Sequence, residues 1–319
     1  MKKLMEHIYE VIGGTPMLCL NRITKHYSVK GNISAKLEYL NPGFSKKDRP
    51  ALQMIEDAEA SGELKQGQTV IELTSGNTGI GLAIVCQSKG HPFIACMSEG
   101  NSIERAKMMY ALGAEVVIVP QTENSVKGQV SGEDLKLVEE MTQRLAKEKN
   151  AFRADQFKLD SSYRSHLLHT AVEMWEQCDG KIDCFVDIVG SGGTFEGCAE
   201  KLKEYNRNIR CYIVEPVNAA VYAGNNLINE GRHKVQGCGY AMDLPIIKKE
   251  LIDGCIQVSD DEAYQMTRDL ARLEGTFVGI SSGANVSAAI KLLKGEYEGK
   301  NIVLILNDSG LKYLSTGLF

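Results

Sequence analysis

Apolar residues along this chain form two kinds of pattern, short continuous runs and longer amphipathic stretches. The short runs are typical of buried strands, and the longer stretches have the 3.6-residue spacing of helices. Strands and helices are predicted in turn at 68–73, 80–89, 92–97, 102–112, 115–119, 135–147, 184–189, 196–205, 210–214 and 301–306. Strands separated by helices of this length favour parallel sheets with helices on both faces, the doubly wound α/β class. Periodicity lapses at about 150–163, where we expect a domain seam.

Composition narrows the function classes. Hydrophobic residues make up 43% and charged residues 24% of the 319 residues, which is ordinary for a soluble globular protein. The net charge of -5 argues against a nucleic-acid binder that relies on bulk attraction to phosphate. No apolar stretch is long enough to span a bilayer, and no signal peptide is evident, so we expect no membrane association and a cytoplasmic location.

The cysteines are scattered and show no C-x-x-C spacing. The nine lie at positions 19, 86, 96, 178, 184, 198, 211, 238 and 255. An odd, unclustered set indicates buried reduced thiols in a cytosolic protein and not a disulfide framework. For the same reason we expect no zinc or other metal site.

Two glycine-containing loops each follow a buried strand and open a helix. Thr74–Gly81 offers hydroxyls, an amide and backbone N–H groups at a helix start, which suits a carboxylate or phosphate. Gly190–Thr194 has three glycines in four residues and a threonine hydroxyl, which suits a phosphate. An ordinary strand-to-helix turn explains either loop alone, but one in each half of the chain favours a bound ligand. A nicotinamide fingerprint would need glycine where Phe195 stands.

A lysine pair stands at the start of a predicted helix. The stretch Ser45–Arg49 follows a Pro-Gly turn and precedes an apolar-periodic run at 51–58, which Ser45 or Asp48 would cap. Cations at a helix N-terminus face the positive end of the dipole. The residues alone leave two interpretations open, exposed lysines at a helix start or a functional amine.

Many motifs in a fixed order identify a family. They occupy 12–17, 36–43, 45–49, 54–59, 74–81, 102–105, 190–194, 279–284 and 308–310. In these motifs the chain resembles, over essentially its whole length, the cysteine synthase and cystathionine β-synthase family of pyridoxal-phosphate (PLP) enzymes. The resemblance implies a fold type II architecture like that of the tryptophan synthase β-subunit, with a PLP cleft between two doubly wound domains. The smaller domain would cover 40–150, and the larger domain 1–39 and 151–319.

The resemblance also implies a role for each site residue. Lys47 would hold PLP as an imine and move the Cα proton, and Asn77 would hydrogen-bond the phenolic oxygen of the cofactor. Ser281 would face the pyridine nitrogen, and because it is not acidic the cofactor is a weaker electron sink, which suits β-elimination. The cofactor phosphate would be bound by Gly190, Ser191, Gly192, Gly193 and Thr194. The substrate would be bound by Thr74, Ser75, Gly76, Asn77, Thr78 and Gln156.

Three departures from the family pattern bear on the substrate. Phe44 replaces a small residue beside the lysine, and Lys158–Arg164 replaces an Asn-Pro-rich stretch. In the run 236–245, where cysteine synthases are small and apolar, Tyr240 resembles the tyrosine of cystathionine β-synthases and Asp243 adds a carboxylate. Such groups protonate a poor leaving group or deprotonate an incoming nucleophile, so we list Tyr240 and Asp243 as candidate catalytic residues. The other interpretation is that both only shape the rim of the cleft.

The expected reaction is therefore β-elimination and β-replacement through an α-aminoacrylate, with L-cysteine releasing hydrogen sulfide and adding water or a thiol. The alternative is cysteine synthesis from O-acetyl-L-serine and sulfide. More remote alternatives are dehydration of serine or threonine and diaminopropionate synthesis. The resemblance suggests a homodimer acting on a small amino acid, either cysteine or an activated serine. Cys238 is expected as an apolar filler, and His166, His169 and His233 as structural or solvent-facing residues.

Overall fold

The computed structural model describes residues 4–101, 103–123, 125, 130–228 and 231–319. The chain divides into two compact units. The first consists of Met1–Ile12 and Asn41–Ser162, and the second of Gly13–Leu40 and Tyr163–Phe319. The domain boundaries implied by the resemblance stay a prediction.

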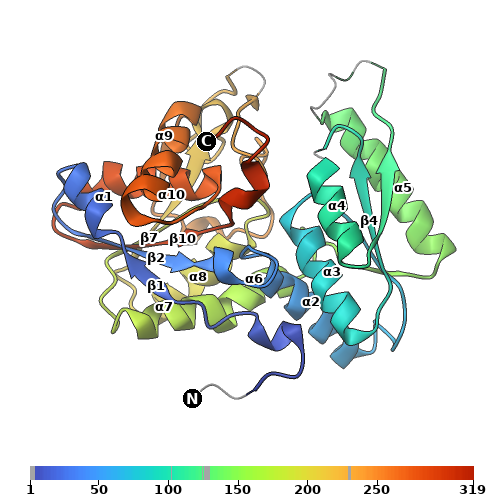
Figure 1. Ribbon diagram of the computed structural model, residues 1–319. Coiled ribbons are helices and arrows are strands. Elements are labelled where there is room, and N and C mark those ends of the chain that lie inside the picture. The colour runs from blue at the N-terminus through green and yellow to red at the C-terminus, as the bar shows by residue number, and fades with distance from the viewer. Residues whose placement is uncertain (1–3, 102, 124, 126–129, 229–230) are drawn as a thin grey trace. The chain divides into compact units, whose positions relative to one another are not determined.

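The first unit is built on a four-stranded parallel sheet in the order β5-β4-β3-β6. Its strands are β3 (Val70–Leu73), β4 (Phe93–Ser98), β5 (Glu115–Val119) and β6 (Phe152–Arg153). Its helices are η1 (Ile8–Val11), α2 (Asp48–Ser61), α3 (Asn77–Lys89), α4 (Ile103–Ala111) and α5 (Gly132–Glu148). In Figure 1, α2 and α3 lie side by side.

Alternate strand residues of this sheet enter different cores. Val70 and Ala95 belong to an apolar cluster with residues of α2 and α3, while Ile71 and Ile94 pack with Val138 of α5. Helices therefore cover both faces of the sheet, as expected for parallel strands buried on both sides. The doubly wound α/β prediction is confirmed here.

The second unit contains a six-stranded sheet in the order β1-β2-β10-β7-β8-β9. Only the β1–β2 pair is antiparallel among the pairs of this sheet. The strands are β1 (Met17–Cys19), β2 (Asn32–Leu37), β7 (Cys184–Ile188), β8 (Arg210–Pro216), β9 (Gly254–Val258) and β10 (Asn301–Leu306). The helices are α1 (Asn21–His26), α7 (Ala171–Gln177), α8 (Gly193–Tyr205), α9 (Asp260–Asp269) and α10 (Ile280–Leu293). Short helical turns are η2 (Glu38–Leu40), η3 (His166–Thr170), η4 (Val217–Ala219), η6 (Lys249–Leu251), η7 (Leu270–Glu274) and η8 (Gly310–Tyr313).

The second sheet is also covered on both faces (Figure 1). Val186 and Leu304 pack with residues of α9 and α10, while Phe185 and Val303 pack with residues of α7 and α8. The loops that follow β7 and β10 are thus fixed to rigid strands, which positions their side chains closely.

Some predicted elements differ in detail. The stretch 161–177 consists of α6 (Ser161–Ser165), the π-turn η3 and α7 in succession. The expected helix 102–112 corresponds to α4, and Ser102 lies outside the described residues. The expected cap of α2 by Ser45 or Asp48 is wrong, because Lys47 is the N-cap residue and makes no side-chain cap. No helix within the described ranges is long and apolar enough to cross a membrane.

Candidate active site

Lys47 lies at the N-cap position of α2, at the end of a tightly turned segment. The Phe44 N–H donates to the Asn41 carbonyl over 2.8 Å, and the Lys47 N–H donates to the Ser45 hydroxyl over 3.2 Å. The Asp48 carboxylate accepts from the Gly43 N–H. These bonds to buried Ser45 and Asp48 fix the backbone from which the lysine side chain extends.

Two glycines bring α3 against the backbone at this lysine. A β-carbon added at Gly81 would lie 3.1 Å from the Lys47 carbonyl oxygen, and one added at Gly79 would lie 2.7 Å from Thr74 Cγ2. The Gly79 N–H also donates to Thr74 Oγ1 over 2.9 Å. Gly79 leaves no room for a β-carbon and Gly81 leaves little, so the start of α3 packs closely against the backbone at Lys47.

Gln156, which follows β6, connects the lysine to this loop. Its Oε1 accepts from Lys47 Nζ over 3.2 Å and from Thr78 Oγ1 over 2.8 Å. Lys47 and Thr78 therefore both donate to one amide oxygen. The structure thus brings together Lys47, Thr78 and Gln156, three of the residues that the sequence singles out.

The other predicted residues of this loop lie alongside. Thr74 is buried, Ser75 accepts from Arg105 Nη1 through its carbonyl oxygen over 3.3 Å, and Gly76 is the N-cap of α3. Asn77 is the first residue of α3. Gly76 provides no side-chain cap, while the Thr74 hydroxyl accepts from the Gly79 N–H in the first turn. The positive end of the helix dipole at this N-terminus favours an anion.

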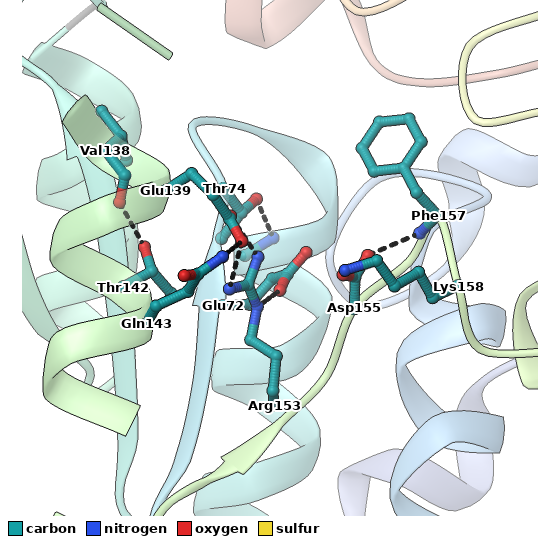
Figure 2. A network of polar contacts seen from close by, with 11 residues as sticks. Glu72, Thr74, Val138, Glu139, Thr142, Gln143, Arg153, Asp155, Phe157 and Lys158 are labelled. Carbon is teal, nitrogen blue, oxygen red and sulfur yellow. Dashed lines mark hydrogen bonds and ion pairs between the residues drawn. The ribbon is translucent and has the colours of Figure 1, made fainter. Parts of the chain in front are cut away.

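A polar network, shown in Figure 2, holds the strand that leads to Gln156. Arg153 Nε donates to the Glu72 carboxylate over 2.7 Å, and Arg153 Nη2 donates to Glu139 over 2.8 Å. Burial raises the pKa of Glu72 to about 8, against the opposing effect of Arg153. Three elements, β3, β6 and α5, are joined by this network. An acidic residue inside the apolar run 68–73 is the sequence signal for this network.

The loop Gly190–Thr194 connects β7 to α8 in the second unit. Gly192 has a φ of 89°, in the left-handed region that favours glycine, and α8 begins at Gly193 with no side-chain cap. Ser191 and Thr194 are buried. The first turn of a 13-residue helix, with two hydroxyls beside it, suits a phosphate group.

His166 is a site residue that the sequence did not reveal. Its Nε2 lies 3.3 Å from Thr194 Oγ1, and its Nδ1 lies 2.9 Å from Thr170 Oγ1 within the π-turn η3. A β-carbon at Gly197 would lie 2.2 Å from the Tyr163 carbonyl oxygen, so this glycine allows α8 to approach η3. His166 is buried and supports the loop, which is the structural one of the two roles expected for it.

The run 236–245 is attached to the same loop. The Gly239 N–H donates to the Val189 carbonyl over 2.9 Å, and a β-carbon at Gly190 would lie 2.6 Å from the Gly237 carbonyl oxygen. Tyr240 follows with 48% of its surface exposed. The candidate specificity segment is therefore adjacent to the predicted phosphate site, which sequence separation did not reveal.

Asp243 has a charged partner. Its carboxylate lies 2.9 Å from Lys249 Nζ, and this hydrogen bond, with a second from Tyr222, lowers the pKa of Asp243. The carboxylate is therefore ionised near neutral pH. It has the protonation state of a general base and not of a general acid.

Ser281 lies in the first turn of α10 and is 8% exposed. Its Oγ accepts a hydrogen bond from Asn307 Nδ2 over 3.1 Å. A hydroxyl carries one proton and two lone pairs, so Ser281 keeps a proton to donate elsewhere.

Comparison with known proteins decides the family. The sequence matches the family described as "Pyridoxal-phosphate dependent enzyme" over residues 8–308. The chain belongs to this family. It is 40% identical over 317 residues to cystathionine β-synthase of Apis mellifera, covering 98% of this chain and 61% of that protein's length. It is 39% identical over 319 residues to cysteine synthase of Staphylococcus aureus strain Mu50, covering 100% of this chain and 98% of that protein.

A solved structure supports the same assignment. A hydrogen sulfide-producing enzyme from Fusobacterium nucleatum has a TM-score of 0.89 and 36% identity, covering 98% of this chain and 99% of that chain. This chain is a PLP-dependent enzyme of the β-replacement type with a fold type II architecture, as the resemblance implied.

The residues present fit the PLP cofactor. A primary amine at Lys47 matches its aldehyde, the uncapped start of α8 matches its phosphate, and the Ser281 hydroxyl matches a ring nitrogen that accepts a hydrogen bond. No cluster of three or more His, Cys, Asp or Glu side chains suited to a metal occurs among the described residues.

The cysteines of this PLP enzyme follow most of the expectation. All nine are free. Six are buried, Cys238 among them, while Cys178 and Cys255 are partly buried. Cys19 is exposed, which corrects the expectation that all are buried. Burial raises the pKa of Cys86 and Cys211, so these thiols stay protonated at neutral pH.

Proposed function

We propose that this enzyme uses L-cysteine, releases hydrogen sulfide, and adds water or a thiol at the same carbon. The Cβ–S bond of the substrate breaks, and sulfide leaves with a proton. A Cβ–O or Cβ–S bond to the incoming nucleophile then forms, and the nucleophile loses its proton. PLP, when bound, accepts the electron pair released at Cα.

The attachment of the run 236–245 to the phosphate loop supports this proposal most. Gly239 is hydrogen-bonded to Val189, so the half-exposed Tyr240 is carried next to the end of β7. Thiolate is a poor leaving group that benefits from a proton, whereas an acetate group leaves without one. A phenol at Tyr240 is a proton donor for the sulfur, and the ionised Asp243 is a base for the incoming water or thiol.

The remaining residues bind and orient. We assign the covalent attachment of PLP and the Cα proton to Lys47, and the phenolic oxygen of PLP to Asn77. The substrate carboxylate is assigned to Thr74, Ser75, Gly76, Asn77, Thr78 and Gln156. The cofactor phosphate is assigned to Gly190, Ser191, Gly192, Gly193 and Thr194, and the ring nitrogen to Ser281. A hydroxyl at the ring nitrogen favours loss of a β-substituent over storage of negative charge on the ring.

A substrate comparison tests the proposal. Purified holoenzyme is given L-cysteine, O-acetyl-L-serine plus sulfide, or O-phospho-L-serine plus sulfide, and both sulfide and amino-acid products are quantified. The proposal expects sulfide from L-cysteine, with Tyr240→Phe slowing that reaction far more than the reaction of O-acetyl-L-serine. Equal slowing of both reactions would remove the proton-donor role, and no sulfide from L-cysteine would end the proposal.

Lys249 offers a separate test of Asp243. The substitution Lys249→Met should raise the pKa of Asp243 toward its ordinary value, because the hydrogen bond between Asp243 and Lys249 is lost. The acid limb of the rate profile should then move to higher pH. Lys248→Met is the matched control, since Lys248 pairs with Glu196 and Glu200. An unchanged acid limb in Lys249→Met would show that Asp243 takes no proton in the reaction.

A second candidate is cysteine synthesis from O-acetyl-L-serine and sulfide. The observation that favours it is 39% identity, end to end, to a protein named cysteine synthase. It predicts rapid consumption of sulfide with O-acetyl-L-serine and little sulfide release from L-cysteine. We also propose a homodimer, on the resemblance alone, and a cytoplasmic location, because scattered cysteines without C-x-x-C spacing are typical of a cytosolic protein. Light scattering on the eluting protein at several concentrations tests the dimer.

A further inference from the structure

Asn307 contacts two neighbouring serines at the start of α10. It follows β10 directly, and its backbone N–H donates to Ser282 Oγ over 2.8 Å. Its side-chain Nδ2 donates to Ser281 Oγ over 3.1 Å. Asn307 is 5% exposed and Ser281 is 8% exposed. The residue is therefore fixed at its backbone and at its side chain, and both contacts are shielded from water.

The direction of the second bond determines where the Ser281 proton goes. The amide nitrogen occupies one lone pair of the Ser281 oxygen, so the hydroxyl proton has to find a different acceptor. An amide turned the other way would present an oxygen, and the hydroxyl would donate to it. The Asn307 side chain thus decides whether Ser281 has a proton available for a ligand.

The other polar atom of the Asn307 amide, its oxygen Oδ1, makes no hydrogen bond to Ser281. Asn307 Oδ1 is buried and has no hydrogen-bond partner. Leaving a buried acceptor unpaired is unfavourable. The amide contacts the serine through its nitrogen, and its oxygen finds no partner among the described residues.

We propose that Asn307 is a positioning residue that directs the hydroxyl proton of Ser281 toward the ring nitrogen of PLP. This inference rests on the role proposed above for Ser281. In this proposal Asn307 does not touch the reacting atoms and acts only through Ser281. An acceptor-only side chain at position 307 should therefore abolish the donation by Ser281 without changing the serine.

The experiment compares four proteins in their PLP-bound form: wild type, Asn307→Asp, Ser281→Ala and the double variant. A carboxylate keeps the shape of the amide but only accepts, so the Ser281 proton turns toward it. Asn307→Asp should change the visible absorbance band of bound PLP in the same direction as Ser281→Ala. The dissociation constant of PLP should rise about 10-fold in each, the effect of about 1.4 kcal/mol. The double variant should show no further change, because both substitutions remove one interaction.

Controls separate this effect from misfolding and from failure of the proposed function. Asn301→Asp lies on the same strand, where the side chain meets Asn32, and should leave the absorbance band unchanged. Asn307→Leu is a second variant, which has no acceptor at position 307. Any change that it makes in the absorbance band of bound PLP should also vanish in a Ser281→Ala background. Additive effects in either double variant, or a wild-type band in Asn307→Asp, would overturn the proposal. Absence of sulfide release from L-cysteine would overturn the proposed reaction and leave these spectra unaffected.

Discussion

The amine of Lys47 donates to the side-chain oxygen of Gln156 over 3.2 Å, across 109 positions of sequence. Thr78 donates to the same oxygen over 2.8 Å. A hydrogen bond that involves a charged group contributes about 1.5–3 kcal/mol. The arrangement makes Gln156 the link between Lys47, which we propose holds the cofactor, and the loop proposed to bind the substrate carboxylate.

Loss of this link should weaken substrate binding. We expect Gln156→Ala to lower kcat/KM by about 10- to 100-fold, mainly through KM, because one interaction with a charged group is lost. Initial rates over a range of substrate concentrations give the two constants. Gln53→Ala is the control, since the Gln53 amide bonds to Asp57 within α2. An unchanged KM in Gln156→Ala would remove Gln156 from the substrate site.

Glu72 should make the stability of the protein depend on pH. Burial raises its pKa from 4.5 in the unfolded chain to about 8, so the folded state holds a proton that the unfolded state has lost. Its stabilising contribution is present below pH 4.5 and is lost as the pH rises through about 8. We expect urea unfolding between pH 5 and pH 9 to show this decline, and Glu72→Gln to flatten it.

The second partner of Arg153 provides a control with the opposite sign. Although burial opposes it, the hydrogen bond from Arg153 lowers the pKa of Glu139. The contribution of Glu139 is therefore lost as the pH falls and not as it rises. Glu139→Gln should keep the decline toward pH 9. If Glu139→Gln flattened that decline and Glu72→Gln kept it, the roles assigned to the two carboxylates would be reversed.

Phe44 has a φ of 61°, in the left-handed region. For a residue with a β-carbon this conformation costs about 1–2 kcal/mol. Glycine removes that cost but loses about 0.4–1 kcal/mol through the entropy of the unfolded chain. We expect Phe44→Gly to raise the free energy of unfolding by up to about 1 kcal/mol, as measured in urea.

Phe157 is the matched control for this substitution. It is 40% exposed, against 43% for Phe44, and is not among the residues with a positive φ. Phe157→Gly should therefore lower the free energy of unfolding by roughly 0.5–1 kcal/mol. Equal losses in the two variants would mean that the backbone at Phe44 carries no strain.

Gly197 should tolerate no β-carbon. In Gly197→Ala the new atom would lie 2.2 Å from the Tyr163 carbonyl oxygen, so α8 has to move away from η3 and His166 from Thr194. We expect a loss of about 1–3 kcal/mol in stability, typical of overpacking, together with weaker PLP binding. Urea unfolding and fluorescence titration with PLP measure the two effects. Gly132→Ala, with nothing within 4 Å, should be neutral or slightly stabilising.

Much of the fold and of the chemistry was readable from contiguous residues. Strand and helix periods, the glycine loops and the lysine at a helix start are local features, because backbone torsion angles and burial on one face impose them on neighbouring positions. The strand and helix periods predicted the doubly wound units, and the family resemblance carried by the motifs implied the PLP-dependent class; both are confirmed. The role of each individual site residue stays a prediction.

Other features of the site required the tertiary structure. Gln156 meets Lys47 because β6 pairs with β3, and Asn307 meets Ser281 because β10 ends beside the start of α10. His166 reaches Thr194 through a π-turn that helical periodicity does not predict. Sequence by itself determined which residue types are available for the reaction. The order of strands in each sheet decided which of them touch, because contacts between distant segments depend on how the elements pack and not on their local pattern.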